Sequence, residues 1–259
     1  AITIDPATPG HYLALGNAFE VAEDISQAEV AYRQALVAAP TLVEAYLRLS
    51  TLYQSEEAWN EAEETLQHGL EMAPASGALL IEYARLQLAH GNETQALALA
   101  DQAVTASPTA GTLIQRAAIY TELGDTDSAK EDLQAALAIE PMAIEALISL
   151  GDLYKADGDR ETAESYYTLA AETLPGVPTG YLRMATLARE DENRDAVVYW
   201  NDLARQAQPG GLLRPTTDDL LAPADSAANG AENEAQQPEA STAAAEEETP
   251  TPGSSDNSE

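Results

Sequence analysis

Apolar residues in the segment 144–175 follow a helical period that is interrupted once. Its first part carries apolar side chains at spacings of three and four residues, namely Leu147, Leu150, Leu153 and Tyr154. Gly158 then ends the run, and Asp159 follows as a candidate N-cap. A second face follows, made of Ala163, Tyr167 and Ala170. The pattern predicts two helices packed as an antiparallel pair, with Pro175 ending the second helix.

This pattern recurs along most of the chain at intervals of 33 or 34 residues. Corresponding units begin at Pro9, Val43, Gly77, Ala110, Ile144 and Pro178. The third unit is degenerate, because Tyr83, Ala84 and Gln87 replace the residues found in its neighbours. The sixth unit is atypical, since its turn lacks glycine. One pair of helices cannot bury both of its apolar faces, so the units are expected to stack.

The slots of the unit resemble those of the tetratricopeptide repeat, as seen at Leu150, Gly151, Tyr154, Gly158, Ala163, Tyr167, Ala170 and Pro175. The resemblance implies an all-α fold, a right-handed α-solenoid of about six helix-turn-helix repeats. We expect a leader at 1–8, repeats at 9–42, 43–76, 77–109, 110–143, 144–177 and 178–209, a capping segment at 210–221 and a disordered acidic tail at 222–259.

The two C-terminal segments are distinguished by composition. The capping segment carries two leucine pairs that could cover the apolar face of the last repeat. The tail has nine acidic residues and lacks basic, aromatic and large aliphatic side chains. Such a composition cannot offset the entropy cost of ordering, so the tail is predicted to be disordered.

The net charge of −32 arises from 44 acidic against 12 basic residues. Nucleic acid is not expected as a partner, because binding to phosphates requires clustered lysines and arginines. Acidity of this degree favours basic partners, although a solvated acidic surface is the simpler explanation. No apolar run reaches membrane-spanning length, so we expect no membrane insertion of this chain.

Little in the sequence supports catalysis or metal binding. Cysteine is absent, which excludes disulfides and thiol chemistry. His11, His68 and His90 lie in three different units and lack metal-ligand spacing. Asp125 and Asp127 lie in an inter-helix turn without the glycine and glutamate of a calcium loop. No phosphate-binding loop or serine elbow occurs. We therefore expect no enzyme, no cofactor and no metal site.

In the family that the pattern resembles, first helices line a concave groove, with the second, fifth, ninth, twelfth and thirteenth positions of each unit facing a ligand. The fifth positions form an aliphatic row: Leu13, Leu47, Ile81, Ile114, Ile148 and Leu182. The ninth positions are Asn17, Thr51, Arg85, Ala118, Asp152 and Thr186. The twelfth positions are Glu20, Gln54, Leu88, Thr121, Lys155 and Arg189. The resemblance thus implies an apolar floor with a mixed polar rim that becomes basic at Lys155 and Arg189. Packing between helices is the alternative role for each aliphatic residue.

Some chaperone-binding members of that family clamp a carboxylate with lysine, asparagine and arginine at these positions. Asn17 and Arg85 match two such slots, whereas Leu13, Thr51 and Ile81 occupy others. The clamp is incomplete, and a carboxylate ligand would be repelled by so acidic a chain. We therefore do not expect this chain to belong to the carboxylate-clamp subgroup.

The leading hypothesis is a bacterial interaction scaffold that binds a protein, as a peptide or helix, in its concave groove. The alternative is a structural subunit whose terminal repeats associate end to end into homo-oligomers or filaments. A helical domain of a longer enzyme is a third class. Localisation is left open, since cytoplasmic residence and export after processing ahead of Ala1 both fit the sequence.

Overall fold

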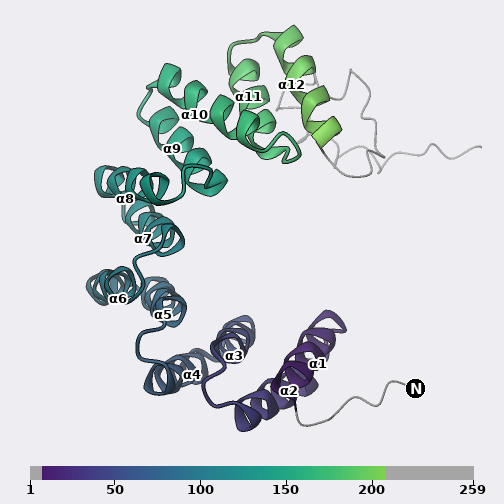
Figure 1. Cartoon of the computed structure of the whole chain (residues 1–259), viewed down its shortest axis with the longest axis vertical. Coiled ribbons are helices and arrows are strands. Elements are labelled where there is room, and N and C mark those ends of the chain that lie inside the picture. The colour runs from purple at the N-terminus through teal and green to yellow at the C-terminus, as the bar shows by residue number, and fades with distance from the viewer. Residues whose placement is uncertain (1–7, 208–259) are drawn as a thin grey trace, which may run out of the picture. The chain divides into compact units, whose positions relative to one another are not determined.

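The computed structural model describes residues 8–207, and every regular element in this range is an α-helix (Figure 1). The helices are α1 (Pro9–Val21), α2 (Ile25–Ala38), α3 (Val43–Ser55), α4 (Trp59–Met72), α5 (Gly77–Ala89), α6 (Glu93–Ala106), α7 (Ala110–Glu122), α8 (Thr126–Ile139), α9 (Ile144–Ala156), α10 (Arg160–Thr173), α11 (Thr179–Glu190) and α12 (Arg194–Ala207). The predicted all-α fold is confirmed for this range. The expected capping segment and acidic tail, and all but Thr8 of the expected leader, lie outside the described residues.

Each odd-numbered helix packs against the even-numbered helix that follows it, and each even-numbered helix packs against the next odd-numbered one. First helices also adjoin one another, because α5 contacts both α3 and α7. Figure 1 shows the pairs following one another in chain order. This nearest-neighbour packing is that of an α-solenoid. Among the described helices, none combines the length and apolar character needed to cross a bilayer.

The short turn inside each pair contains one residue in the left-handed conformation. Three pairs place glycine there, Gly91, Gly124 and Gly158, with φ of 76°, 79° and 83°. The other three place glutamate there, Glu23, Glu57 and Glu192, with φ of 59°, 57° and 55°. Only glycine adopts this conformation without a steric cost. The sixth pair therefore keeps the same turn geometry although its sequence lacks the turn glycine.

Aspartates cap three of the second helices. The carboxylates of Asp24, Asp125 and Asp159 accept hydrogen bonds from backbone N–H groups three residues later, each at 3.2 Å. The predicted cap at Asp159 is therefore present. The hydroxyl of Ser128 also donates to Asp125, and these hydrogen bonds lower the pKa of the Asp125 carboxyl. Asp125 thus has a sufficient structural role as a helix cap.

Buried apolar side chains form three clusters along the stack. The first spans α2 to α6 and includes Ile119 of α7. The second lies on α7, α8 and α9, and the third on α9, α10 and α11. Both later clusters draw residues from α9, so their packing is joined through that helix. The side chains around these clusters decide which of the predicted groove residues reach the surface.

Candidate interaction surface

The odd-numbered helices present the side chains that the sequence predicts for ligand binding. All of the predicted residues, from Leu13 to Arg189, lie on α1, α3, α5, α7, α9 or α11. Because α5 contacts both α3 and α7, the outward side chains of these three helices belong to one continuous surface. We call the side chains at the fifth, ninth and twelfth positions of all six first helices the first-helix surface, and α3, α5 and α7 form its middle.

The aliphatic row at the fifth positions is not a uniform floor. Ile81, Ile114 and Ile148 are 6%, 6% and 8% exposed, and each belongs to a buried cluster. Leu13 and Leu47 are half-buried, and Leu182 is exposed. The three isoleucines therefore pack between helices, which was the alternative role. They offer almost no area to a ligand in this conformation.

Two of the ninth-position residues hold tyrosines of the second helices. The Tyr32 hydroxyl donates to Asn17 at 2.8 Å and lies 2.5 Å from Glu20. The Tyr167 hydroxyl donates to Asp152 at 2.6 Å. Burial, followed by the hydrogen bond to a carboxylate, raises the pKa of both tyrosines. Asn17 and Asp152 therefore have structural roles within their own helix pairs.

The threonines of the surface bond within their own helices. The hydroxyls of Thr51, Thr121 and Thr186 donate to the carbonyls of Leu47, Ala117 and Leu182, one turn earlier, at 2.8 to 2.9 Å. All three threonines are exposed. Their oxygens can still accept hydrogen bonds from a ligand.

Polar contacts bridge consecutive first helices at three places. Gln54 of α3 donates to Glu82 of α5 at 2.8 Å. Between α9 and α11, Arg183 pairs with Asp152 at 2.8 Å and Lys155 with Glu190 at 2.6 Å. The hydrogen bond from Lys155, and a second from Arg160, lower the pKa of the Glu190 carboxyl. Asp152 and Lys155 are therefore held in internal ion pairs, whereas Arg189 of α11 is exposed and forms none with a residue from 8 to 207.

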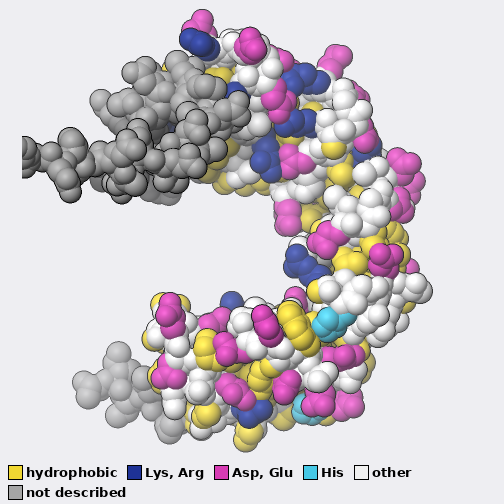
Figure 2. All heavy atoms as spheres, turned by 180° about the vertical axis from the view of Figure 1, so that it is seen from behind, with side chains coloured by type: hydrophobic (Ala, Val, Ile, Leu, Met, Phe, Trp, Pro, Cys, Tyr) yellow, Lys and Arg dark blue, Asp and Glu magenta, His cyan; other side chains and the backbone are white. Residues whose placement is uncertain are grey.

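Basic side chains are unevenly distributed. Among the described residues, three lie in α1–α6 and eight in α7–α12. Figure 2 shows acidic side chains predominating over α1–α4 and most of the basic ones over the later helices. Lys155 is neutralised by Glu190, so the predicted basic end of the surface depends on Arg189.

The middle of the surface carries groups without such partners. Arg85 of α5 is exposed and forms no ion pair with any residue from 8 to 207. Leu88, one turn later, and Ala118 of α7 are half-buried. A cation beside partly exposed aliphatic groups can bind an extended or helical segment through one polar and several apolar contacts.

Sequence reasoning missed a shallow pocket at the first two pairs. It has a volume of about 430 Å³ and is lined by Asn17, Glu20, Val21 and Arg48. Glu20 was noted only as a twelfth position, and Arg48 was not singled out, because it lies at the sixth position of its unit. Arg48 is held by Glu44 at 2.8 Å on the same helix. Within the described range, no three His, Asp or Glu side chains gather as metal ligands would.

The tetratricopeptide repeat model matches residues 110–141 and 144–173. The chain carries tetratricopeptide repeats. It is 32% identical over 110 residues to a tetratricopeptide repeat and J domain-containing co-chaperone, DNJ1, of Fusarium oxysporum f. sp. lycopersici. That match covers 42% of this chain and 21% of the co-chaperone, so the chain spans about a fifth of that relative's length.

Solved structures share the fold. PilW, described as a widely conserved type IV pilus biogenesis factor, matches with a TM-score of 0.59 and 19% identity, over 76% of this chain and 92% of PilW. Pseudomonas aeruginosa PilF matches with a TM-score of 0.58 and 20% identity, over 80% of this chain and 94% of PilF. A thermophilic TPR protein of Thermus thermophilus matches with a TM-score of 0.54 and 22% identity, over 76% of this chain and 98% of that protein. At these identities the likeness establishes the repeat fold alone. Repeats of this family are protein-interaction modules.

Proposed function

We propose that each helix pair is one repeat of a non-enzymatic scaffold, and that the scaffold binds a peptide or helix of a protein partner along its concave first-helix surface. The contact is centred on α5 and its neighbours α3 and α7. The family match supports a protein partner, and the adjoining first helices supply a continuous surface. The partner lies across the helices and touches side chains from several repeats.

The observation that carries this proposal is the exposed cation in the middle of the surface, where consecutive first helices contact one another. At α9 and α11, ion pairs already join the helices to each other. At α5, Arg85 is exposed and has no ion-pair partner within 8–207, and Leu88 adjoins it one turn later. The middle therefore offers an arginine, a residue type enriched at binding hot spots, beside a partly exposed leucine.

Partner capture with a charge-reversed surface tests the proposal. Arg85→Glu combined with Thr121→Glu alters two exposed positions of the first-helix surface and lowers the net charge by three. The matched control, Arg194→Glu with Ala98→Glu, adds the same charge at exposed positions of the second helices α12 and α6. The first variant should lose the partners that wild type and control recover. Equal recovery by all three proteins would overturn the proposal.

One observation favours a second candidate function, end-to-end self-association. Leu15 of α1 is 44% exposed, whereas Leu49 and Leu150, the seventh residues of the second and fifth units, are 4% and 0% exposed. The latter two are covered because another helix pair precedes theirs. A second copy of the chain could cover Leu15 in the same way, through a heterologous contact.

A further inference from the structure

At the contact between the third and fourth helix pairs, an arginine stands at a repeat position that is apolar or aromatic in the other units. Arg116 is the seventh residue of its unit, where the other units have Leu15, Leu49, Tyr83, Leu150 and Met184. In the second and fifth units this residue is part of a buried apolar cluster. The fourth unit therefore has a charged side chain at a position where the neighbouring units have a side chain that packs in the core.

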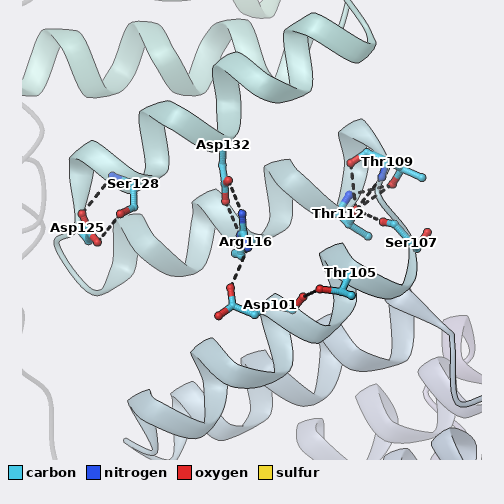
Figure 3. A network of polar contacts seen from close by, with 9 residues as sticks. All are labelled: Asp101, Thr105, Ser107, Thr109, Thr112, Arg116, Asp125, Ser128 and Asp132. Atoms are coloured by element: carbon cyan, nitrogen blue, oxygen red, sulfur yellow. Dashed lines mark hydrogen bonds and ion pairs between the residues drawn. The ribbon is translucent and has the colours of Figure 1, made fainter.

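Arg116 is held by carboxylates from two other helices (Figure 3). Its Nε and Nη2 donate to the two oxygens of Asp132 on α8, both at 2.7 Å. Its Nη1 donates to Asp101 on α6 at 2.8 Å. Asp132 is buried, whereas Asp101 is exposed. One guanidinium thus links α6, α7 and α8, and the bond to α6 is the exposed one.

A second polar cluster lies at the start of α7. The hydroxyl of Thr112, a buried residue, lies 2.5 Å from the Ser107 carbonyl and 3.1 Å from the Thr109 hydroxyl (Figure 3). The corresponding third positions in other units include Ala45, Leu79 and Ala146. The link between α6 and α7 has three residues, whereas those after α2, α4 and α8 have four. Thr112 therefore fixes a shortened link by hydrogen bonds.

The buried apolar clusters change at the same place. The first cluster ends on α6 apart from Ile119, and the second begins on α7. Val104 and Leu123 are the partly buried residues that pack across the contact. Elsewhere in the stack, a single cluster draws several buried residues from both sides of each contact between consecutive pairs, as at α4 and α5 or at α10 and α11, whereas Ile119 alone extends the first cluster onto α7.

We propose that the contact between α6 and α7 is a polar joint, at which α1–α6 and α7–α12 unfold as two separate cooperative blocks. In a linear stack, cooperativity is set by each interface between neighbours, and the weakest interface divides the unfolding transition. One ion pair, between Arg116 and Asp101, crosses this interface at a position that is apolar or aromatic in the other units, and an exposed ion pair of this kind contributes little to stability. The joint adjoins the middle of the first-helix surface, because α5 contacts both α6 and α7.

The two tryptophans of the chain report on the two blocks separately. Trp59 lies on α4 and Trp200 on α12. In full-length Trp200→Phe and Trp59→Phe variants, urea unfolding is followed by the fluorescence of the remaining tryptophan. The unfolding of each variant is also followed by circular dichroism, so that a change of midpoint caused by the substitution itself is recognised. We expect two different midpoints. Coincident transitions for both probes would overturn the proposal.

Replacing the ion pair by apolar groups locates the division. Arg116→Leu with Asp132→Leu restores an apolar contact, because well-packed hydrophobic residues can substitute for a buried ion pair. This change should bring the two midpoints together. The control, Glu44→Leu with Arg48→Leu, removes an ion pair within α3 and should leave them apart. Separate midpoints in the Arg116–Asp132 variant would show that the division lies elsewhere.

Hydrogen exchange of the unaltered chain provides a test that does not depend on any variant folding. Under native conditions, the slowest amides of α1–α6 and those of α7–α12 should exchange through two openings of different free energy. A single common free energy for the slowest amides of both blocks would overturn the proposal.

Discussion

The ring of Tyr167 on α10 occupies the space that a side chain at Gly151 on α9 would need. A Cβ atom built on Gly151 would lie 2.6 Å from Cδ1 of Tyr167, well inside van der Waals contact. The tyrosine hydroxyl then reaches Asp152 at 2.6 Å. Gly16 and Tyr32 repeat this arrangement in the first helix pair. The glycine thus makes room for a buried tyrosine whose hydroxyl bonds the neighbouring helix.

We expect Gly151→Ala to lower the free energy of unfolding by about 1–3 kcal/mol, the usual cost of overpacking a core position. The ring of Tyr167 must move, and its hydrogen bond to Asp152 lengthens. Urea unfolding followed by circular dichroism measures the change. An unaltered free energy of unfolding would mean that α9 and α10 can accommodate the added methyl group without loss of stability.

A compensating variant tests whether the ring is the cause. In the fourth pair, Ala117 and Leu133 occupy the positions of Gly151 and Tyr167, and both are buried. Gly151→Ala combined with Tyr167→Leu reproduces that combination. The pair of changes should therefore destabilise by less than the sum of the two single changes. Strict additivity would rule out the steric explanation.

The second prediction concerns the isoleucines of the first-helix surface. Ile114→Glu with Ile148→Glu should unfold the chain, because these positions are 6% and 8% exposed and a carboxylate there has no partner. Circular dichroism should show a loss of helix. The exposed substitutions Thr51→Glu and Thr121→Glu should leave helix content unchanged. A folded isoleucine variant would return both residues to the candidate binding site.

Features inside one repeat could be predicted from the sequence because they depend on nearby residues. The apolar period, Gly158 and Asp159 together predict two helices and a capped turn, and the structure has them. Glu192 takes the same turn conformation without glycine, since packing of the flanking helices outweighs the local preference. Local rules therefore predict the helices better than they predict the residue that closes each turn.

Features between repeats could not be predicted in this way. The partner of Lys155 is Glu190, which lies in the next unit, so the cation that suggested a basic groove is already paired. The burial of Ile148 depends on α10 and α11, and it resembles an exposed groove position when α9 is considered alone. Arg116 was not noted because its two carboxylates lie on other helices. The candidate site depends on these contacts.

The third prediction is a loss of stability at alkaline pH. Burial, followed by its hydrogen bond to Glu29, raises the pKa of Tyr53 from 10.0 to about 12. The folded state thus holds this proton more tightly than the unfolded state. Its stabilising contribution is complete below pH 10 and is lost as the pH rises from 10 to about 12.

Tyr53→Phe separates this effect from general alkaline denaturation. The phenylalanine keeps the ring but cannot ionise, so the variant should lose less stability than wild type between pH 10 and about 12. At pH 7 it should be less stable, because the hydroxyl bonds to Glu29 and Arg33, at 2.8 and 2.7 Å, are gone. Parallel pH profiles of wild type and variant would contradict the assignment to Tyr53.

The last prediction distinguishes end-to-end association from a monomeric scaffold. If a second copy covers α1, Leu15 becomes buried in the contact, as Leu150 is within the stack. Leu15→Lys should then weaken association at least tenfold, because burying a leucine side chain stabilises by about 1.5–3 kcal/mol and the lysine adds a charge. Sedimentation velocity over a concentration series measures this. Val37→Lys, at a position on α2 that is 84% exposed, is the matched control and should associate like wild type. A wild type that stays monomeric, or a Leu15→Lys variant that associates equally well, would exclude α1 as the contact and leave groove binding as the better-supported function.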